Sequence, residues 1–227
     1  MDAIAETVIH TSIPNEGRLA DVLKGRHARR FRRSLERESR DFSRLLQKWI
    51  YPRLSYTIRK IVSTEGGAVT LQGGTVLKSS KLARALRGCH DLLCFIATIG
   101  PGVDDNIRRF MSQNRLTDMY ALDIIGSTAI EDVVDTFHAT MSDTLRKEGN
   151  DVSLRFSPGY CDWSVIEQKE LFAMVDPARI DVTLLPSFLM LPRKSISGVF
   201  GIGADIQRPP YNPCSHCGKH SCKERRS

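Results

Sequence analysis

The sequence lacks any long uncharged apolar stretch. No run of about 18 apolar residues is free of charge, so no membrane-spanning helix is expected. The start of the chain carries an acid at Asp2 and no apolar core of the kind that a secretory signal has. No internal repeat is visible. These absences predict a cytoplasmic protein without a membrane partner.

What the chain does have is enough apolar material for a core. Hydrophobic residues make up 41% of its 227 residues, and charged residues make up 26%, which is an ordinary share for a globular protein. This length predicts one compact domain with extensions, or at most two small domains. The six cysteines are expected to be thiols or metal ligands, because disulfides are rare in the cytoplasm.

Positive charge is concentrated near the start of the chain. The net charge is +7, and residues 24–60 hold 13 Lys and Arg against 3 acids. Such a basic face attracts anions in general, so it favours nucleic acid, an acidic protein or a phosphate-bearing cofactor without choosing among them.

The first part of the chain predicts helices. Residues 1–16 are expected to form an irregular arm. From residue 17 to about 63, apolar residues recur at helical spacing, and Pro52 is expected to kink or divide this region.

The rest of the chain mixes strands and helices. The continuous apolar run at 92–99 is typical of a buried strand. Turn signals at 72–74 predict a hairpin of strands 68–71 and 75–77. Further helices are expected at 79–86, 103–113, 117–147 and 165–174, further strands at 152–156, 182–185 and 196–202, and irregular chain from 204 to 227.

This order predicts an α+β fold: a mixed or antiparallel central sheet with flanking helices, preceded by a basic helical N-terminal region. We expect three parts, which are a basic helical region at 1–64, an α+β domain at 65–205 and a cysteine-rich tail at 206–227.

The most unusual stretch is residues 155–163, RFSPGYCDW. A strand delivers Arg155, Ser157 and Pro158 turn the backbone, Gly159 permits a close approach, and Tyr160 follows at the lip. The guanidinium of an arginine suits a carboxylate, and an aromatic ring suits a flat or cationic group. The residues therefore fit an amino acid, a nucleotide or a sulfonium such as S-adenosylmethionine, or else a structural turn with a surface arginine.

Three blocks of the sequence resemble the activation domain of cobalamin-dependent methionine synthase. RFSPGY is similar to the Arg-x-x-x-Gly-Tyr signature of that family, and residues 162–176 resemble the helix after it. Residues 185–198 resemble the block that ends in Ser-x-Ser-Gly. Residues 121–131 resemble the long helix that carries a glutamate toward the ligand, with Glu131 at the matching position. The resemblance covers residues 68–203.

The resemblance implies reactivation of a corrinoid enzyme in methionine biosynthesis and one-carbon metabolism. An external donor such as a flavodoxin or ferredoxin supplies one electron, S-adenosylmethionine supplies the methyl group, and the cobalamin is carried by a partner corrinoid protein or methionine synthase module. The implied S-adenosylmethionine-binding residues are Glu131, Arg155, Ser157, Pro158, Gly159 and Tyr160. None of them is expected to act as a catalytic acid or base, because the protein binds and positions the reactants.

The sequence departs from the pattern of the large methionine synthases. Cys161 follows Tyr160 where those enzymes usually have proline, and no tyrosine pair follows the Ser-Gly strand, since the next tyrosine is Tyr211. The basic N-terminal helices also have no match there. The pattern is more similar to short stand-alone relatives, which often end in a cysteine cluster.

The tail holds a Cys-x2-Cys-x4-Cys cluster. Thiolates at this density bind zinc or an iron–sulfur cluster. Zinc takes four ligands, so Cys214, Cys217, Cys222 and His220 are the candidate set, the alternative being a reduced tail without metal.

Two other functions fit parts of the sequence. The basic segment and the cysteine tail would suit a nucleic-acid-binding protein with a metal knuckle. A non-catalytic docking partner of a corrinoid protein is the second alternative. We rank the activation factor first, as a component of a cobalamin-dependent methyltransferase system, and regard a nucleic-acid partner as the weaker expectation.

Overall fold

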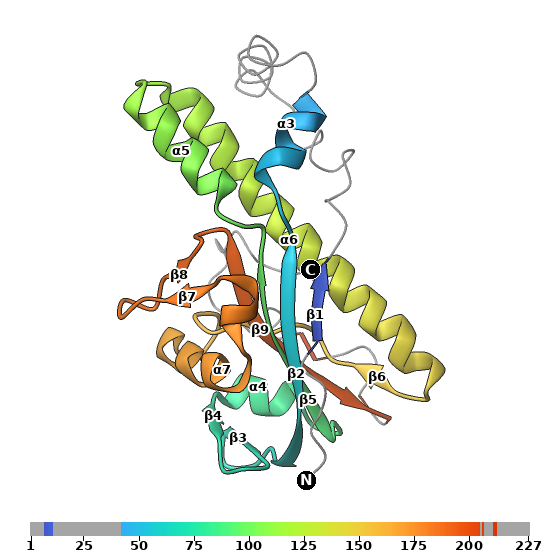
Figure 1. Ribbon diagram of the computed structural model, residues 1–227. Coiled ribbons are helices and arrows are strands. Elements are labelled where there is room, and N and C mark those ends of the chain that lie inside the picture. The colour runs from blue at the N-terminus through green and yellow to red at the C-terminus, as the bar shows by residue number, and fades with distance from the viewer. Residues whose placement is uncertain (1–6, 11–41, 205, 207–210, 213–227) are drawn as a thin grey trace.

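The computed structural model describes residues 7–10, 42–204, 206, 211 and 212 (Figure 1). An antiparallel sheet forms its centre, with the strand order β4-β3-β2-β5-β9-β6, and β1 also pairs with β2. Helices cover both faces, which confirms the predicted α+β class. The strands of this sheet are β1 Thr7–His10, β2 Arg53–Ser63, β3 Ala68–Leu71, β4 Val76–Lys78, β5 Asp91–Thr98, β6 Asp151–Val152 and β9 Ser195–Gly203.

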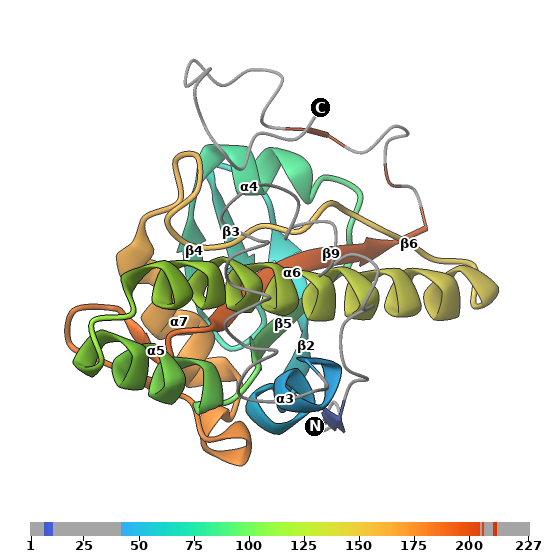
Figure 2. The ribbon, with the colours of Figure 1, turned by 90° about the horizontal axis from the view of Figure 1, so that it is seen from above.

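The long helix α6, Leu116–Lys147, runs diagonally across one face of the sheet (Figure 1). Helix α5, Gly102–Ser112, packs beside its first half (Figure 2), and α3, Phe42–Trp49, packs against α5. Alternate residues of β5 and β9 face this layer. Their side chains form one core with α6 and include Leu93, Phe95, Ala97, Phe200 and Ile202.

The other face of the sheet is covered by shorter elements. They are α4 Ser80–Ala85, the 3-10 turns η1 Val165–Glu167 and η2 Pro177–Ile180, and α7 Gln168–Met174. The intervening residues of the strands, such as Leu92, Cys94 and Val199, form a second core with this layer. A small hairpin of β7 Thr183–Leu184 and β8 Met190–Leu191 follows the α7 layer in the chain.

Residues 53–63 were predicted as helix, and this prediction is wrong. They form strand β2, which pairs with β5 along one edge and with β1 and then β3 along the other. Pro52 ends the helical part, because proline cannot continue a helix, and Leu54, Ser55, Tyr56 and Thr57 then alternate apolar with polar side chains. Residues 53–63 of the predicted N-terminal region therefore lie inside the sheet.

Three further predictions need correction or fall outside the described residues. Thr7–His10 is a strand and not part of an irregular arm, because it pairs with the first half of β2. Of the strand predicted at 152–156, only Val152 lies in β6, and Phe156 forms an isolated bridge to Val199. Residues 17–41 and nearly all of the tail lie outside the described residues, so the remaining predictions for them stay predictions.

The hairpin, the α4 helix, strand β5 and helices α5, α6 and α7 are confirmed close to their predicted positions. Among the described residues, no helix is long and apolar enough to cross a membrane.

An aromatic cluster joins the sheet to α6. The ring of Phe200 lies 6.3 Å from that of Phe95, 6.1 Å from that of Phe137 and 4.8 Å from that of His138. Replacing Phe200 with alanine leaves a cavity between the layers, so we expect the free energy of unfolding to fall by about 3–5 kcal/mol. Urea denaturation followed by circular dichroism measures the loss. Val62→Ala, on an exposed position of β2, is the control and is expected to cost less than about 1 kcal/mol.

Candidate functional site

The segment that follows β6 runs back along β9 and places Arg155. The backbone N–H of Ser153 donates to Gly201 O at 2.9 Å, and its Oγ accepts from the N–H of Gly201 at 2.9 Å. Phe156 and Val199 exchange two backbone hydrogen bonds of 2.9 and 2.8 Å. Arg155 lies between these two anchors, so its backbone position is fixed on both sides.

The guanidinium of Arg155 contacts two carboxylates of α6. Its Nη2 donates to Glu131 Oε2 at 3.1 Å and to Asp135 Oδ1 at 2.8 Å. Glu131 and Asp135 are four residues apart and therefore lie on one face of the helix. We call these three residues the carboxylate–arginine cluster. The structure thus brings together the two residues that the sequence nominated as the polar ends of a ligand site, and it adds Asp135, which the sequence analysis missed.

Exposure within this cluster is uneven. The Arg155 side chain is 9% exposed, whereas those of Glu131 and Asp135 are 42% and 44% exposed. One positive and two negative charges leave the cluster with a net charge of −1. Its accessible part is thus anionic, and an incoming ligand meets carboxylate oxygens before it meets the guanidinium.

The predicted turn after Arg155 is held by its own backbone. The N–H of Gly159 donates to Trp163 O at 2.8 Å, and that of Trp163 donates to Tyr160 O at 3.0 Å. Gly159 has φ +92°, a left-handed value that strains other residues, so glycine is required at this position. The indole of Trp163 is buried in the second core and fixes the end of the turn.

The same turn is tied to α4. Asp162 accepts hydrogen bonds from Ser79 Oγ at 2.6 Å and from the N–H of Lys81 at 3.1 Å. Glu167 accepts from the N–H of Lys78 at 2.8 Å. The acids after the motif therefore act as structural ties between two distant segments of the chain.

The other predicted ligand residues differ in accessibility. Pro158 is buried and Ser157 is half-buried, while Gly159 is exposed and Tyr160 is 46% exposed. A Cβ placed on Gly198 would lie 3.0 Å from Ser157 Oγ and 2.8 Å from Phe156 O, so a glycine in β9 lets the turn cross the strand. Tyr160 is thus the member of the turn that presents a large side chain to solvent.

Lys194 is a second buried cation whose partners lie on α6. Lys194 Nζ donates to Asp123 Oδ1 at 2.7 Å and to Ser127 Oγ at 2.9 Å. Asp123, Ser127, Glu131 and Asp135 are spaced by four, so one stripe of α6 serves both Lys194 and Arg155. The spacing is visible in the sequence, but the partners become visible only when β9 and residue 155 pack against the helix.

Two serines near the start of β9 and a histidine on α6 have structural contacts. Ser195 Oγ donates to Pro192 O at 2.7 Å and also contacts Thr98 Oγ1 at 3.0 Å, while Ser197 is buried. His138 Nε2 contacts Ser153 O at 2.9 Å, and its ring packs on Phe200.

Two of the three described cysteines, Cys89 and Cys94, pack inside the structure, and Cys161 is exposed. Cys94 is fully buried in β5, and Cys89 lies against Gly201. Within the described ranges, no three His, Cys, Asp or Glu residues form a group that could hold a metal. The predicted metal ligands Cys214, Cys217, Cys222 and His220 lie outside the described residues, so the metal assignment stays a prediction.

No protein-family model matches this sequence, and no curated protein matches it either. Among solved structures, the chain is similar to the crystal structure of the MetH reactivation domain bound to AdoHcy. The likeness has a TM-score of 0.65 at 16% sequence identity, and it covers 92% of this chain and 81% of that chain. At this identity the likeness defines the fold, which is that of a reactivation domain.

Burial sets the reactivity of the cysteines. It raises the pKa of Cys89 and of Cys94 from 9.0 to about 12. At pH 8 this lowers the reactive thiolate fraction about a thousandfold relative to an unshifted thiol. We expect iodoacetamide to modify exposed Cys161 in the native protein while Cys89 and Cys94 stay unmodified until urea unfolds the chain. Peptide mass spectrometry distinguishes the sites, and native labelling of Cys94 would contradict its buried position.

Proposed function

We propose that this chain binds S-adenosylmethionine at the carboxylate–arginine cluster and the Gly159–Tyr160 turn. In this role it is an activation factor for reductive remethylation of cobalamin held by a partner methionine synthase module or related corrinoid protein. The observation that carries the proposal is the contact between Arg155 and Glu131, two residues 24 positions apart, within a reactivation-domain fold.

The ligand's charges match the groups available. S-adenosylmethionine carries a sulfonium, an ammonium and a carboxylate, so two positive charges accompany one negative charge. Glu131 and Asp135 are the accessible acceptors for the ammonium or the ribose hydroxyls and offset the sulfonium charge. Arg155 holds both carboxylates in place. Its planar guanidinium could also donate to the ligand carboxylate, which would then replace one of the two protein carboxylates.

The turn supplies the rest of the site. Gly159 has no side chain to obstruct a close approach, and Tyr160 presents a ring that can pack on a flat or cationic group. The ties from Asp162 to α4 keep this turn in one conformation, which reduces the ordering cost of binding. The corrinoid, which the partner carries, would supply the nucleophile that accepts the methyl group. The residues of this chain bind and orient the donor.

Calorimetric titration with S-adenosylmethionine tests the site. We expect micromolar-range binding by the full chain and a loss of at least about tenfold in Arg155→Ala, because that change removes the partner that positions Glu131 and Asp135. Arg108→Ala removes an exposed arginine of α5 and serves as the control, with unchanged affinity. A folded wild-type chain that binds no S-adenosylmethionine would contradict an autonomous site, and the docking-partner alternative would then gain weight.

The net charge of the cluster predicts a preference between ligands. Asp135→Asn makes the cluster neutral, so the attraction for the sulfonium is reduced. We expect the affinity for S-adenosylmethionine to fall about tenfold, or ~1.4 kcal/mol, and that for the uncharged thioether S-adenosylhomocysteine to fall by a smaller factor. The ratio of the two dissociation constants is the readout. Equal losses for both ligands would show that Asp135 does not interact with the sulfonium charge.

A further inference from the structure

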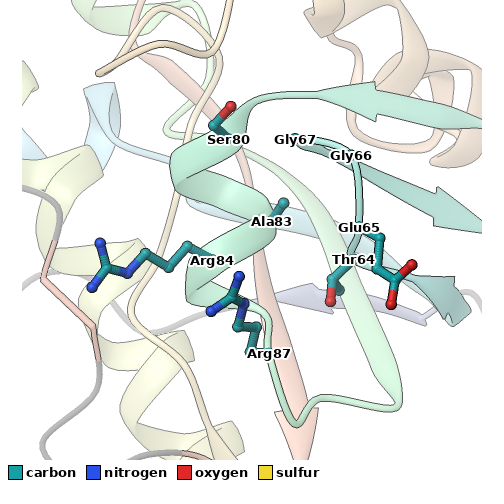
Figure 3. Close-up of a pocket in the computed structure, with 8 residues that line it drawn as sticks. All are labelled: Thr64, Glu65, Gly66, Gly67, Ser80, Ala83, Arg84 and Arg87. Carbon is teal, nitrogen blue, oxygen red and sulfur yellow. The ribbon is translucent and has the colours of Figure 1, made fainter.

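A hollow lies on the other face of the sheet from the α6 carboxylates. It is bounded by α4 on one side and by the turn between β2 and β3, residues 64–67, on the other (Figure 3). Its volume is about 400 Å³, within the range of small-molecule sites. Neither the resemblance nor the proposed function uses it.

One stripe of α4 and its following turn lines this hollow. Ser80, Ala83, Arg84 and Arg87 follow the i, i+3, i+4, i+7 spacing of a single helical face. The opposite face, with Leu82 and Leu86, is buried in the second core. The arginines are thus directed outward by the same amphipathic pattern that docks the helix.

Both arginines are exposed, and neither contacts a carboxylate within the part of the chain that the structure describes. This differs from other described arginines, since Arg108, Arg115, Arg146 and Arg179 each contact an aspartate nearby in sequence. Glu65 also lines the hollow, but its side chain points away from both guanidinium groups (Figure 3). Both arginines therefore line the hollow without a carboxylate partner, and Arg84 extends from α4 on the side away from residues 64–67 (Figure 3).

Arg84 is further organised by an aromatic ring. Its guanidinium lies 4.7 Å from the centre of the Tyr211 ring, which packs against the second core. Stacking uses the flat face of a guanidinium. Its N–H donors lie in the plane of the group and therefore stay available for hydrogen bonds. The restricted side chain loses less conformational freedom when a ligand binds.

The opposite wall is backbone. Gly66 and Gly67 have φ +64° and +75°, and a Cβ on Gly67 would lie 2.8 Å from Ser80 Oγ. Glycine is therefore required for the turn to approach α4 this closely. At the two glycines this wall offers peptide groups, and the hydroxyls of Thr64 in the turn and Ser80 on α4 also line the hollow.

We propose that this hollow is a binding site for a phosphate group, either free phosphate or the terminal phosphate of a small metabolite. Arginine pairs matched to phosphate oxygens form strong charge-assisted hydrogen bonds, and two monocations match a dianion. A cavity closed by a turn on one side suits a single compact group. Nucleic acid, in contrast, needs a line of cations along its backbone.

Calorimetry on the full chain tests this site, at constant ionic strength in a chloride buffer. The probes are inorganic phosphate, pyrophosphate and glycerol 3-phosphate, and their relative affinities distinguish the free anion from a phosphate ester. We expect binding that falls at least tenfold in the double variant Arg84→Gln/Arg87→Gln. The matched control Arg108→Gln/Arg179→Gln also removes two exposed charges and should leave binding unchanged.

Three results would overturn the proposal. The first is no phosphate binding by the folded wild-type chain up to millimolar concentration. The second is an equal loss in the control variant, which would indicate general charge attraction. Binding of an oligonucleotide with no response to the three small probes would likewise replace it with a nucleic-acid surface. Arg155→Ala should leave phosphate binding intact, so this test is independent of the S-adenosylmethionine site.

Discussion

Strand β5 has to be covered on both faces, and the other layers are arranged around this requirement. Seven of its eight residues are buried, and residues 92–97 form an unbroken apolar run rather than an alternating one. Water on either face would leave Phe95 or Ile96 exposed, at a cost of about 1.5–3 kcal/mol for each such side chain. Helix α6 therefore covers one face and the α4–α7 layer covers the other. The candidate site lies where α6 passes the segment that returns along β9.

Burying Arg155 imposes a second constraint. A buried cation needs partners, because its loss of hydration is otherwise uncompensated. Glu131 and Asp135 meet this need from α6, as Asp123 does for Lys194. These ion pairs join α6 to β9 and to the segment before the turn. The polar stripe of α6 therefore has a structural role whether or not a ligand is bound.

Elements with clear periodicity could be predicted from the sequence. Helices α5 and α6 and strand β5 have long apolar patterns, and the glycine turns define the β3–β4 hairpin. Strand β2 could not be predicted, because arginines and lysines interrupt its alternation and a helical pattern precedes it. Its identity depends on pairing with β5, which follows only after the β3–β4 hairpin and α4.

The candidate site, like the fold, could be predicted in part from the sequence. The turn chemistry and the resemblance identified Arg155 and Glu131, and the structure brings them together. Asp135 and Lys194 were missed because an acid on a helix, or a lysine just before a strand, carries no local signal of its partner. Their contacts arise from the crossing of α6 over β9, which is a tertiary property.

A shared fold at 16% sequence identity is consistent with the different requirements of the packed layers and of a ligand site. The layers require only apolar residues of suitable size, together with small residues where β9 is crossed at Gly198 and Gly201. A ligand site requires individual polar atoms. Because Arg155 already has two carboxylate partners, a ligand carboxylate gains only the difference between the new ion pair and the one that it replaces. In the proposed S-adenosylmethionine site, the affinity would therefore depend chiefly on what the ligand offers Glu131 and Asp135, which are its accessible charges.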